Sequence, residues 1–276
     1  MSIKIILVTL FPEIVKNTLE MGVIGQAISE GKILINVMSP RQFVSDIHKT
    51  VDDRPYGGGD GMLMLANPLA DLIESLGSRE HLKTIYMSPH GSVFSHSKAV
   101  ELASLKDKTM VFICGRYGGI DQRFINTFVD EELSLGDFVL SGGELAALSM
   151  IDAIGRQVNG VLGHEDSSKK DSFALDGLLE SVSFTRPREW REQLVPSILL
   201  SGNHEKIDEF KNVISMIVTF KKRKKLFENY LRSKKFTTKQ IQKYEKLLLS
   251  LSENELNSLS INKKEIEEFL IFIAQV

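Results

Sequence analysis

The sequence predicts an α/β domain with a mostly parallel sheet, followed by a small, all-helical C-terminal domain. Strand-like and helix-like runs alternate over the first 160 residues, and no convincing strand pattern follows them. The charge divides in a similar way. Residues 1–180 carry 24 Asp and Glu against 16 Lys and Arg, whereas residues 181–276 carry 12 against 18.

The strands are predicted by continuous apolar runs, because a strand that is buried on both faces is apolar at every position. These runs cover residues 3–9, 32–38, 84–87 and 110–114. The helices are predicted by apolar residues at helical spacing. They cover residues 13–30, 121–129 and 144–158 in the first domain, and residues 189–200 and 207 onward in the second.

The apolar periodicity stops between the two predicted domains. Residues 163–172 are almost entirely polar, which is typical of a mobile linker. We therefore expect one domain over residues 1–162, a flexible linker over residues 163–178 and a helical domain over residues 179–276.

The composition indicates a globular protein. With 276 residues, of which 42% are apolar and 25% charged, the chain is long enough for a substantial core. The one cysteine, Cys114, excludes an intramolecular disulfide and fits a reducing compartment. The apolar start lacks a basic leader and the length of a membrane span. These features predict a cytoplasmic protein with no membrane partner.

The excess of basic residues in the second domain favours a polyanion as partner. Residues 221–225 are five consecutive Lys and Arg and form the densest positive cluster. A solvated basic helix face explains the same charges equally well, so charge alone leaves both interpretations open.

Three glycine-rich segments are candidates for a binding site: residues 52–61, 114–121 and 135–144. Any one of them, taken alone, is equally well explained as a turn. The second and third each follow a predicted strand and precede a predicted helix. In an open parallel sheet this position is the carboxyl edge, where ligands bind, so we expect a pocket built by loops.

Several common sites are disfavoured by the spacing. No segment continues into the Gly-Lys-Ser/Thr of a P-loop, and the first strand ends in Leu10-Phe11-Pro12 rather than in a glycine-rich dinucleotide turn. The six histidines form no pair at i,i+4 spacing and have no cysteine partner nearby, which argues against zinc. A Ser-His-Asp triad stays open, although no Gly-x-Ser-x-Gly elbow is present.

Longer motifs in a fixed order identify a family. The chain resembles the bacterial tRNA (guanine-N1)-methyltransferases of the SPOUT superfamily, in register from about residue 3 to residue 210. The resemblance rests on residues 50–59 (TVDDRPYGGG), 86–89 (YMSP), 115–117 (GRY), 136–145 (GDFVLSGGEL), 160–165 (GVLGHE), 184–187 (FTRP) and 199–204 (LLSGNH).

The resemblance implies a SPOUT-type sheet with a deep trefoil knot in residues 1–162, a rare exception to unknotted topology. It also implies that S-adenosylmethionine binds within this knot, held largely by backbone groups. Carried over by motif, the cofactor-binding residues are Tyr86, Met87, Ser88, Pro89, Gly115, Tyr117, Leu135, Gly136, Asp137, Phe138, Val139, Leu140, Gly142 and Gly143.

The resemblance further implies two catalytic residues. The family's general base, on the linker, corresponds to Asp171, and its basic residue after the Gly-Gly-Glu motif corresponds to Arg156. Guanine N1 is protonated at neutral pH and must lose this proton before it attacks a methyl group, which a carboxylate can accept. Arg156 would stabilise the negative charge that develops on guanine O6.

The family also implies the partners. It acts as a homodimer with the active site at the subunit interface, and residues 179–276 would bind the anticodon arm of tRNA. The target is the guanosine immediately 3′ of the anticodon, and the product, 1-methylguanosine, supports reading-frame maintenance. Residues implied to border the neighbouring base are Asp52, Asp53, Arg54, Gly57, Gly58 and Gly59.

The chain departs from the family pattern at three places. Gly118 stands where the family has a glutamate tied to its magnesium dependence, so a Mg²⁺ requirement is in question and no metal ligand is assigned. Ala146 replaces a proline after Gly-Gly-Glu-Leu. Beyond residue 210, the basic run at residues 221–225 replaces an arginine-rich helix.

Two rival functions are left open by these departures. One is a related knotted methyltransferase that acts on another RNA, against which the segment at residues 52–56 argues. The other is a tRNA-binding protein that has lost catalysis, as the glycine at position 118 suggests. The presence of both Arg156 and Asp171 argues against this second alternative.

Overall fold

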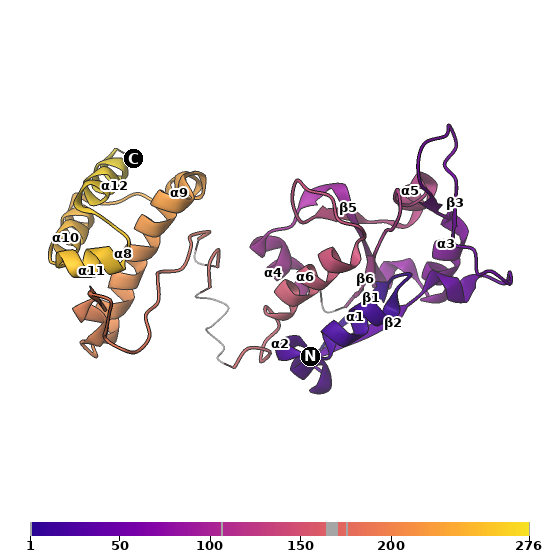
Figure 1. Cartoon of the computed structure of the whole chain (residues 1–276), viewed down its shortest axis with the longest axis horizontal. Helices are drawn as coiled ribbons and strands as arrows, with labels where there is room; N and C mark the ends of the chain where they lie inside the picture. Colours follow the sequence, from indigo (N-terminus) through magenta and orange to yellow (C-terminus); the bar gives the residue numbers. More distant parts are fainter. Residues whose placement is uncertain (1, 106, 164–170, 175, 276) are drawn as a thin grey trace. The chain divides into compact units, whose positions relative to one another are not determined.

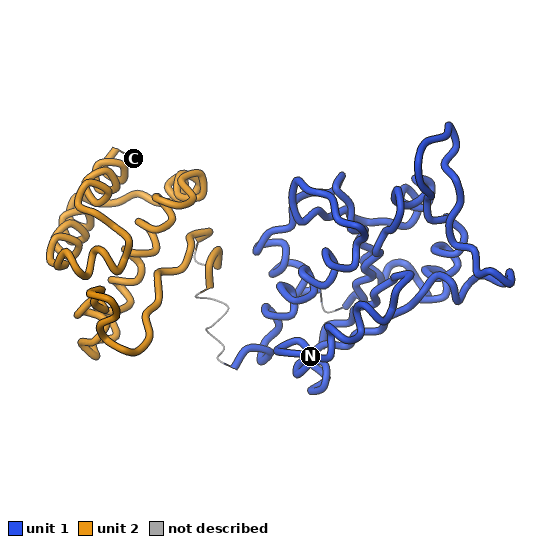
Figure 2. Tube along the Cα trace, in the orientation of Figure 1, with its two compact units in different colours: residues 1–165 blue, residues 166–276 orange. Residues whose placement is uncertain are grey.

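The computed structural model of the chain describes residues 2–105, 107–163, 171–174 and 176–275. Its contacts divide the chain into two compact units, Met1–Glu165 and Asp166–Val276, which we call unit 1 and unit 2 (Figure 2). Each unit has hydrophobic core residues of its own. Of the predicted linker, residues 164–170 and 175 lie outside the described residues.

Unit 1 is built on a parallel sheet of five strands in the order β2-β1-β6-β5-β7 (Figure 1). The strands are β1 (Ile3–Val8), β2 (Ile33–Met38), β5 (Leu82–Val93), β6 (Thr109–Ile113) and β7 (Glu131–Ser134). Side chains of β6 alternate between two cores, because successive residues of a strand point to opposite faces. The prediction of an α/β protein with a parallel sheet is confirmed.

Helices cover both faces of this sheet. The first core contains side chains of α1 (Pro12–Leu19), α2 (Gly22–Ser29), α4 (His96–Ala103) and α6 (Glu144–Gly155). The second core contains α3 (Ala66–Ser75) and α5 (Gln122–Phe128). Short 3₁₀ turns, η1 (Pro40–Phe43) and η2 (Arg79–His81), complete the connections together with a hairpin of β3 (Asp52–Asp53) and β4 (Leu63–Met64).

Two predicted elements of unit 1 differ in the structure. The single helix predicted over residues 13–30 is two helices, because Met21 is extended and Gly22 takes a φ of +67°, which turns the chain. Strand β5 is longer than the predicted 84–87 and includes the whole motif at Tyr86–Pro89. Its pairing with β7 shifts register between Met87 and Ser92.

Unit 2 is mainly helical. Its helices are α8 (His204–Lys222), α9 (Lys224–Leu231), α10 (Thr238–Leu249), α11 (Glu253–Ser258) and α12 (Lys263–Ala274), preceded by the 3₁₀ turn η3 (Ser197–Leu200). The centre of α8 is buried from Val213 to Thr219, and side chains from the other helices pack around it. Three of the helices begin with a complete capping box, at Thr237, Ser252 and Asn262.

The prediction of a helix over residues 189–200, and with it an all-helical second domain, is wrong. Strands β8 (Glu189–Trp190) and β9 (Gln193–Leu194) form a short antiparallel hairpin there. Its two turn residues, Arg191 and Glu192, both have positive φ, as the tightest hairpin turns require. Pro196 follows, and a residue before proline is disfavoured in a helix.

The described helices include none that is both long enough and apolar enough to cross a membrane.

Candidate active site

One cavity of about 460 Å³ opens at the carboxyl edge of the sheet in unit 1. Its walls come from the end of β5, the loop after β6 and the loop between β7 and α6. These are three of the segments that the sequence singled out, and they lie far apart along the chain. The volume falls in the usual range for a small-molecule site.

Most of the predicted cofactor residues line this cavity. Those that do are Tyr86, Met87, Ser88, Pro89, Gly115, Tyr117, Leu135, Phe138, Val139, Leu140, Gly142 and Gly143. Gly136 and Asp137 are not among the lining residues. Gly136 takes a φ of +153°, and its carbonyl accepts a hydrogen bond from the Phe138 amide. Gly136 and Asp137 therefore form a turn, and Phe138, which follows it, lines the cavity.

The structure adds lining residues that were not among the predicted cofactor-binding residues. They include His90, Arg116, Ile120, Gln122, Ile125, Leu133, Ser134 and Ala146. Several of them directly follow or precede a predicted residue, so the motif positions gave a usable signal. Gln122 and Ile125 lie three residues apart on α5, where no motif marks them, whereas Ala146 on α6 directly follows the Gly-Gly-Glu-Leu motif.

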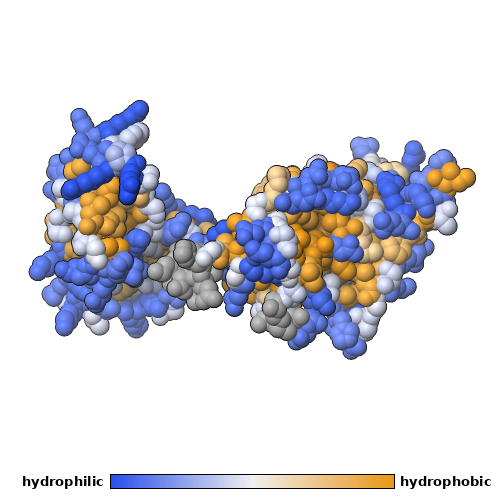
Figure 3. Space-filling view, turned by 90° about the horizontal axis from the view of Figure 1, so that it is seen from below, coloured by the Kyte–Doolittle hydropathy of each residue, from blue (hydrophilic) through white to orange (hydrophobic). Residues whose placement is uncertain are grey.

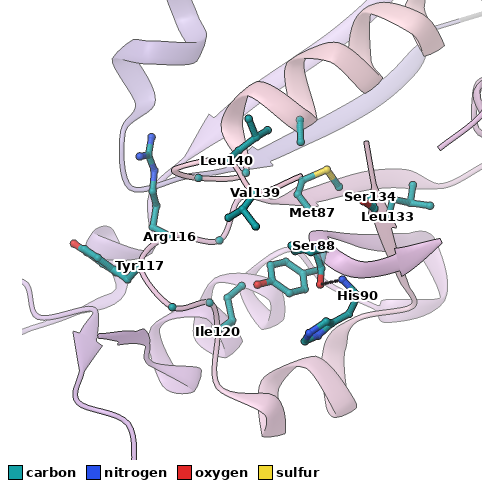
Figure 4. Close-up of a pocket in the computed structure, with 18 of the residues that line it drawn as sticks. Met87, Ser88, His90, Arg116, Tyr117, Ile120, Leu133, Ser134, Val139 and Leu140 are labelled. Carbon is teal, nitrogen blue, oxygen red and sulfur yellow. Dashed lines mark hydrogen bonds between the residues drawn. The ribbon is translucent and has the colours of Figure 1, made fainter. Parts of the chain in front are cut away.

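The cavity is lined by aliphatic side chains and by hydroxyl, amide and imidazole groups. In Figure 4, Met87, Val139 and Leu140 lie on one side, Ser88, His90 and Ile120 on the other, and Arg116 and Tyr117 extend outward. The Ser88 hydroxyl accepts a hydrogen bond from the His90 amide at 3.1 Å. Burial, reinforced by the charge of Glu132, raises the pKa of Tyr86 to about 12, so its hydroxyl keeps its proton at neutral pH.

Two glycines allow the loops to approach closely. A Cβ atom on Gly115 would lie 2.8 Å from the Tyr86 ring, and one on Gly142 would lie 2.3 Å from Arg116 Nε. Both distances are too short for a side chain without movement of the neighbour. A side chain at either position would therefore displace the end of the Tyr86 or the Arg116 side chain, which the turn interpretation of the segments did not foresee.

A buried ion pair holds the cavity loops to one another. Glu144, at the start of α6, is 1% exposed, and its Oε2 lies 2.9 Å from Nε of Arg116. The Thr9 hydroxyl donates to Glu144 Oε1 at 2.6 Å. The Arg116 guanidinium also stacks on Phe11, 4.6 Å from its ring centroid. We call Thr9, Phe11, Arg116 and Glu144 the loop clamp, since it joins the ends of β1 and β6 to α6.

Cys114 lies next to this clamp but is fully buried. Its burial, together with the negative charge of Glu144, raises the pKa of the thiol well above its ordinary value. The thiol is therefore protonated at neutral pH, and a protonated thiol is a poor nucleophile.

The glycine-rich segment that follows β3 adjoins the rim of the cavity. The Gly118 amide donates to the carbonyl of Met62 at 2.8 Å, and the Met64 amide donates to that of Gly119 at 2.9 Å. Asp52, Asp53, Arg54, Gly57, Gly58 and Gly59 belong to this hairpin and its loop, and none of them lines the cavity. The loop is exposed, and its three glycines all take positive φ.

The two predicted catalytic residues are not brought to the cavity within unit 1. Arg156 is the C-cap of α6, whereas the cavity lies at the N-terminal end of that helix. A helix of 12 residues is about 18 Å long. Asp171 belongs to unit 2, where its carbonyl accepts a hydrogen bond from the Ala174 amide at 3.1 Å.

The donor set of the cavity does not fit magnesium. Mg²⁺ is bound through carboxylates, and the described residues that line the cavity include no Asp or Glu. Within the described ranges, no group of three or more His, Cys, Asp or Glu side chains is arranged to hold a metal ion.

The chain is an α/β protein with a pocket built by loops at the carboxyl edge of an open parallel sheet, which is where such proteins bind their ligands. The model of the family tRNA (guanine-1)-methyltransferase TrmD matches residues 3–229. The chain therefore belongs to this family.

Similar proteins carry the same name, tRNA (guanine-N(1)-)-methyltransferase. The protein from Actinobacillus succinogenes is 48% identical over 224 residues, which are 80% of this chain and 90% of the relative. The one from Idiomarina loihiensis is 48% identical over 226 residues, 80% of this chain and 88% of the relative. The family match ends at residue 229, before helices α10 to α12.

Proposed function

We propose that this protein transfers a methyl group from S-adenosylmethionine to N1 of the guanosine immediately 3′ of the anticodon in tRNA. The product, 1-methylguanosine, supports reading-frame maintenance. The observation that carries the proposal is that three motifs of a tRNA (guanine-1)-methyltransferase family enclose one cavity of about 460 Å³.

The groups that line the cavity suit S-adenosylmethionine, which joins a nucleoside to a methionine tail. Met87, Val139 and Leu140 offer apolar contact to the adenine, and loop amides and carbonyls are available for its polar edge. The Tyr86 hydroxyl, which stays protonated, can donate a hydrogen bond. When bound, the cofactor supplies an electrophilic methyl group on a sulfonium.

Asp171 accepts the proton from guanine N1 in this proposal, which makes N1 a nucleophile. A positioned general base contributes about 10²–10⁴-fold to a rate. Arg156 stabilises the negative charge that develops on O6. The target base leaves its stack in the anticodon loop to reach the cavity, and residues 52–54 and 57–59 border the base that precedes it.

The position of Arg156 supports a homodimer with a shared active site. Arg156 is at the opposite end of a helix of about 18 Å (about 1.5 Å per residue) from the cavity of its own unit, so in this proposal a second copy supplies it. Exposed apolar side chains on neighbouring elements offer an interface. They are Phe11 and Ile14 at α1, Leu145 on α6, and Val139 in the cavity loop. Figure 3 shows broad apolar areas on one face of unit 1.

We further propose that the parts of the chain have the roles that the family implies. Residues 1–162 form the SPOUT methyltransferase domain, with its trefoil knot around the cofactor loops, and residues 163–178 connect this domain to the second one. Residues 179–276 bind the anticodon arm, and the protein acts in the cytoplasm, where tRNA is modified. Because the cavity lacks carboxylates, no step is assigned to magnesium.

The test is methyl transfer from labelled S-adenosylmethionine to a tRNA with guanosines at the target position and immediately 5′ of it. The matched control changes only the target guanosine, and both RNAs are measured with and without Mg²⁺. We expect incorporation that is lost in the control, and its response to Mg²⁺ tests whether Gly118 changes the metal dependence that the family implies. Absence of incorporation with tRNA still bound would contradict the proposal.

A further inference from the structure

Strand β7 lies at an edge of the sheet in unit 1 and presents one glutamate on each face. Glu131 is the register partner of Ile85, whose side chain belongs to the core beneath α4 and α6. Glu132 is the register partner of Tyr86, whose side chain belongs to the core beneath α3 and α5. Because successive residues of a strand point to opposite faces, the two carboxylates have different surroundings.

Only the first of these carboxylates is paired. The oxygens of Glu131 lie 3.1 Å from Nζ of Lys83 and 2.9 Å from Nζ of Lys98. Glu132 forms no ion pair with the residues that the structure describes, and its Oε2 is buried without a hydrogen-bond partner. Burial of an unpartnered carboxylate oxygen costs free energy, so folding alone does not explain a glutamate at this position.

The negative charge of Glu132 acts on the wall of the cavity. Tyr86 lines the cavity from β5. Leu133 and Ser134, which directly follow Glu132, line it from β7 (Figure 4). Glu132 itself is not a lining residue, so its charge acts from behind the wall. Burial, and after it the charge of Glu132, raises the pKa of Tyr86 to about 12.

The permanent charge in the cavity wall is already compensated. Among the described lining residues, Arg116 is the one side chain that carries such a charge, and it is paired with Glu144 in the loop clamp. The charge of Glu132 is not cancelled in this way. Because charges interact more strongly in a partly buried site than in water, Glu132 favours a positively charged ligand in the cavity.

The methyl donor and the product that it leaves differ by one positive charge. The donor carries a sulfonium, whose methyl group forms its new bond to guanine N1. The sulfur keeps the electron pair of the broken S–CH₃ bond and becomes a neutral thioether, and the N1 proton goes to the general base. A negative charge beside the cavity therefore stabilises the bound donor but not the bound product.

We propose that Glu132 is a specificity-determining residue, whose charge makes the cavity bind S-adenosylmethionine in preference to S-adenosylhomocysteine, the neutral product. This inference rests on the proposed function, which makes these two compounds the ligands of the cavity. It assigns to Glu132 the replacement of product by fresh donor after each methyl transfer.

The experiment measures the dissociation constants of both compounds by calorimetry, for the full chain and for three variants. Glu132→Gln removes the charge and nearly keeps the shape of the side chain, whereas Glu132→Asp keeps the charge. Glu101→Gln is the matched control, because it removes one carboxylate from the exposed side of α4, where solvent screens the charge.

We expect Glu132→Gln to weaken the binding of S-adenosylmethionine by about three- to tenfold, the order expected for unit charges that do not touch at an effective dielectric constant of about 20. Its affinity for S-adenosylhomocysteine should hardly change. Glu132→Asp and Glu101→Gln should keep the wild-type ratio of the two affinities.

A wild-type ratio in Glu132→Gln, or an equal change of the ratio in Glu101→Gln, would overturn the inference. Equal weakening of both ligands in Glu132→Gln would show a structural role and would overturn it as well. A wild-type chain that binds neither ligand would refute the proposed function instead, so the two failures are distinguishable.

Discussion

Unit 1 and unit 2 use charged side chains in opposite ways. In the loop clamp of unit 1, Glu144 is buried and is paired with Arg116 and Thr9, which reach it from other segments. On α9 and α10 of unit 2, cations such as Lys239 and Lys246 are exposed and form no ion pair within the described ranges. One set of charges holds the protein's own loops, and the other is available to a partner.

The difference predicts how each region responds to substitution. A buried ion pair that loses one partner leaves an uncompensated charge or polar group, so a single change has a large effect. Exposed phosphate-binding cations share their contribution among many similar contacts, so single changes have small effects. The predictions below run from the largest expected effect to the smallest and test this comparison.

Asp171→Ala is expected to reduce methyl transfer by at least 10²–10⁴-fold, because guanine N1 then has no positioned base. Affinity for S-adenosylmethionine should stay nearly unchanged, since Asp171 belongs to unit 2 whereas the cavity lies in unit 1. Single-turnover rates and calorimetric binding measure the two quantities. A large loss of cofactor affinity would contradict the assignment of Asp171 as base.

Glu144→Gln is expected to destabilise unit 1 by about 3 kcal/mol, because it breaks a buried ion pair and leaves Arg116 without its carboxylate. The measurement is chemical unfolding, followed for the single variants and for the double variant with Arg116→Gln. In the double variant, Arg116→Gln should lower the free energy of unfolding far less than it does in the wild-type chain. Additive effects would show that the loop clamp is not a coupled unit.

Gly142→Ala is expected to cost about 1–3 kcal/mol of stability, since its Cβ would displace Arg116 from the loop clamp. We also expect weaker binding of S-adenosylmethionine, because Gly142 and Arg116 both line the cavity. Gly163→Ala is the matched control, because an added Cβ there would meet nothing within 4 Å and the residue does not line the cavity, so it should change neither quantity. Wild-type binding in the Gly142 variant would remove the packing argument for this glycine.

Within the basic run at residues 221–225, two groups of cations should differ in whether their replacement affects tRNA binding or stability. Replacing Lys222, Arg223 and Lys225 by alanine should weaken tRNA binding and flatten its salt dependence, while the thermal midpoint hardly moves. Replacing Lys221 and Lys224 should lower the midpoint, because they contact Glu265 and the Phe220 and Phe272 rings. An unchanged salt slope in the first variant would identify these residues as solvated surface.

Sequence patterns predicted the elements whose signal is local. The strand predicted at residues 110–114 corresponds to β6, Thr109–Ile113, because an apolar run marks a strand that is buried on both faces. The capping boxes at Thr237, Ser252 and Asn262 are equally local and could have given the starts of three helices. The hairpin at Glu189–Leu194 was missed because its two turn residues are not glycine or asparagine.

The motifs also predicted which loops line the same cavity, but not which side-chain contacts hold these loops together. Twelve of the predicted cofactor residues line one cavity, while Gln122 and Ile125 line it from helix α5, which no motif marks. The sequence marked Glu144 as part of Gly-Gly-Glu, but its role follows from contacts with Thr9 and Arg116. The function itself came from the order of the motifs and not from the geometry of any one of them.

By itself, the sequence determined the alternation of strands and helices, the family and the excess of positive charge near the C-terminus, because each is encoded in neighbouring residues or in motif order. Only the tertiary structure decided that Thr9 and Glu144, 135 positions apart, share a hydrogen bond. It also decided which cations of residues 221–246 are paired and which are exposed. Burial and pairing depend on residues that become neighbours only when the chain folds, and no local pattern carries that information.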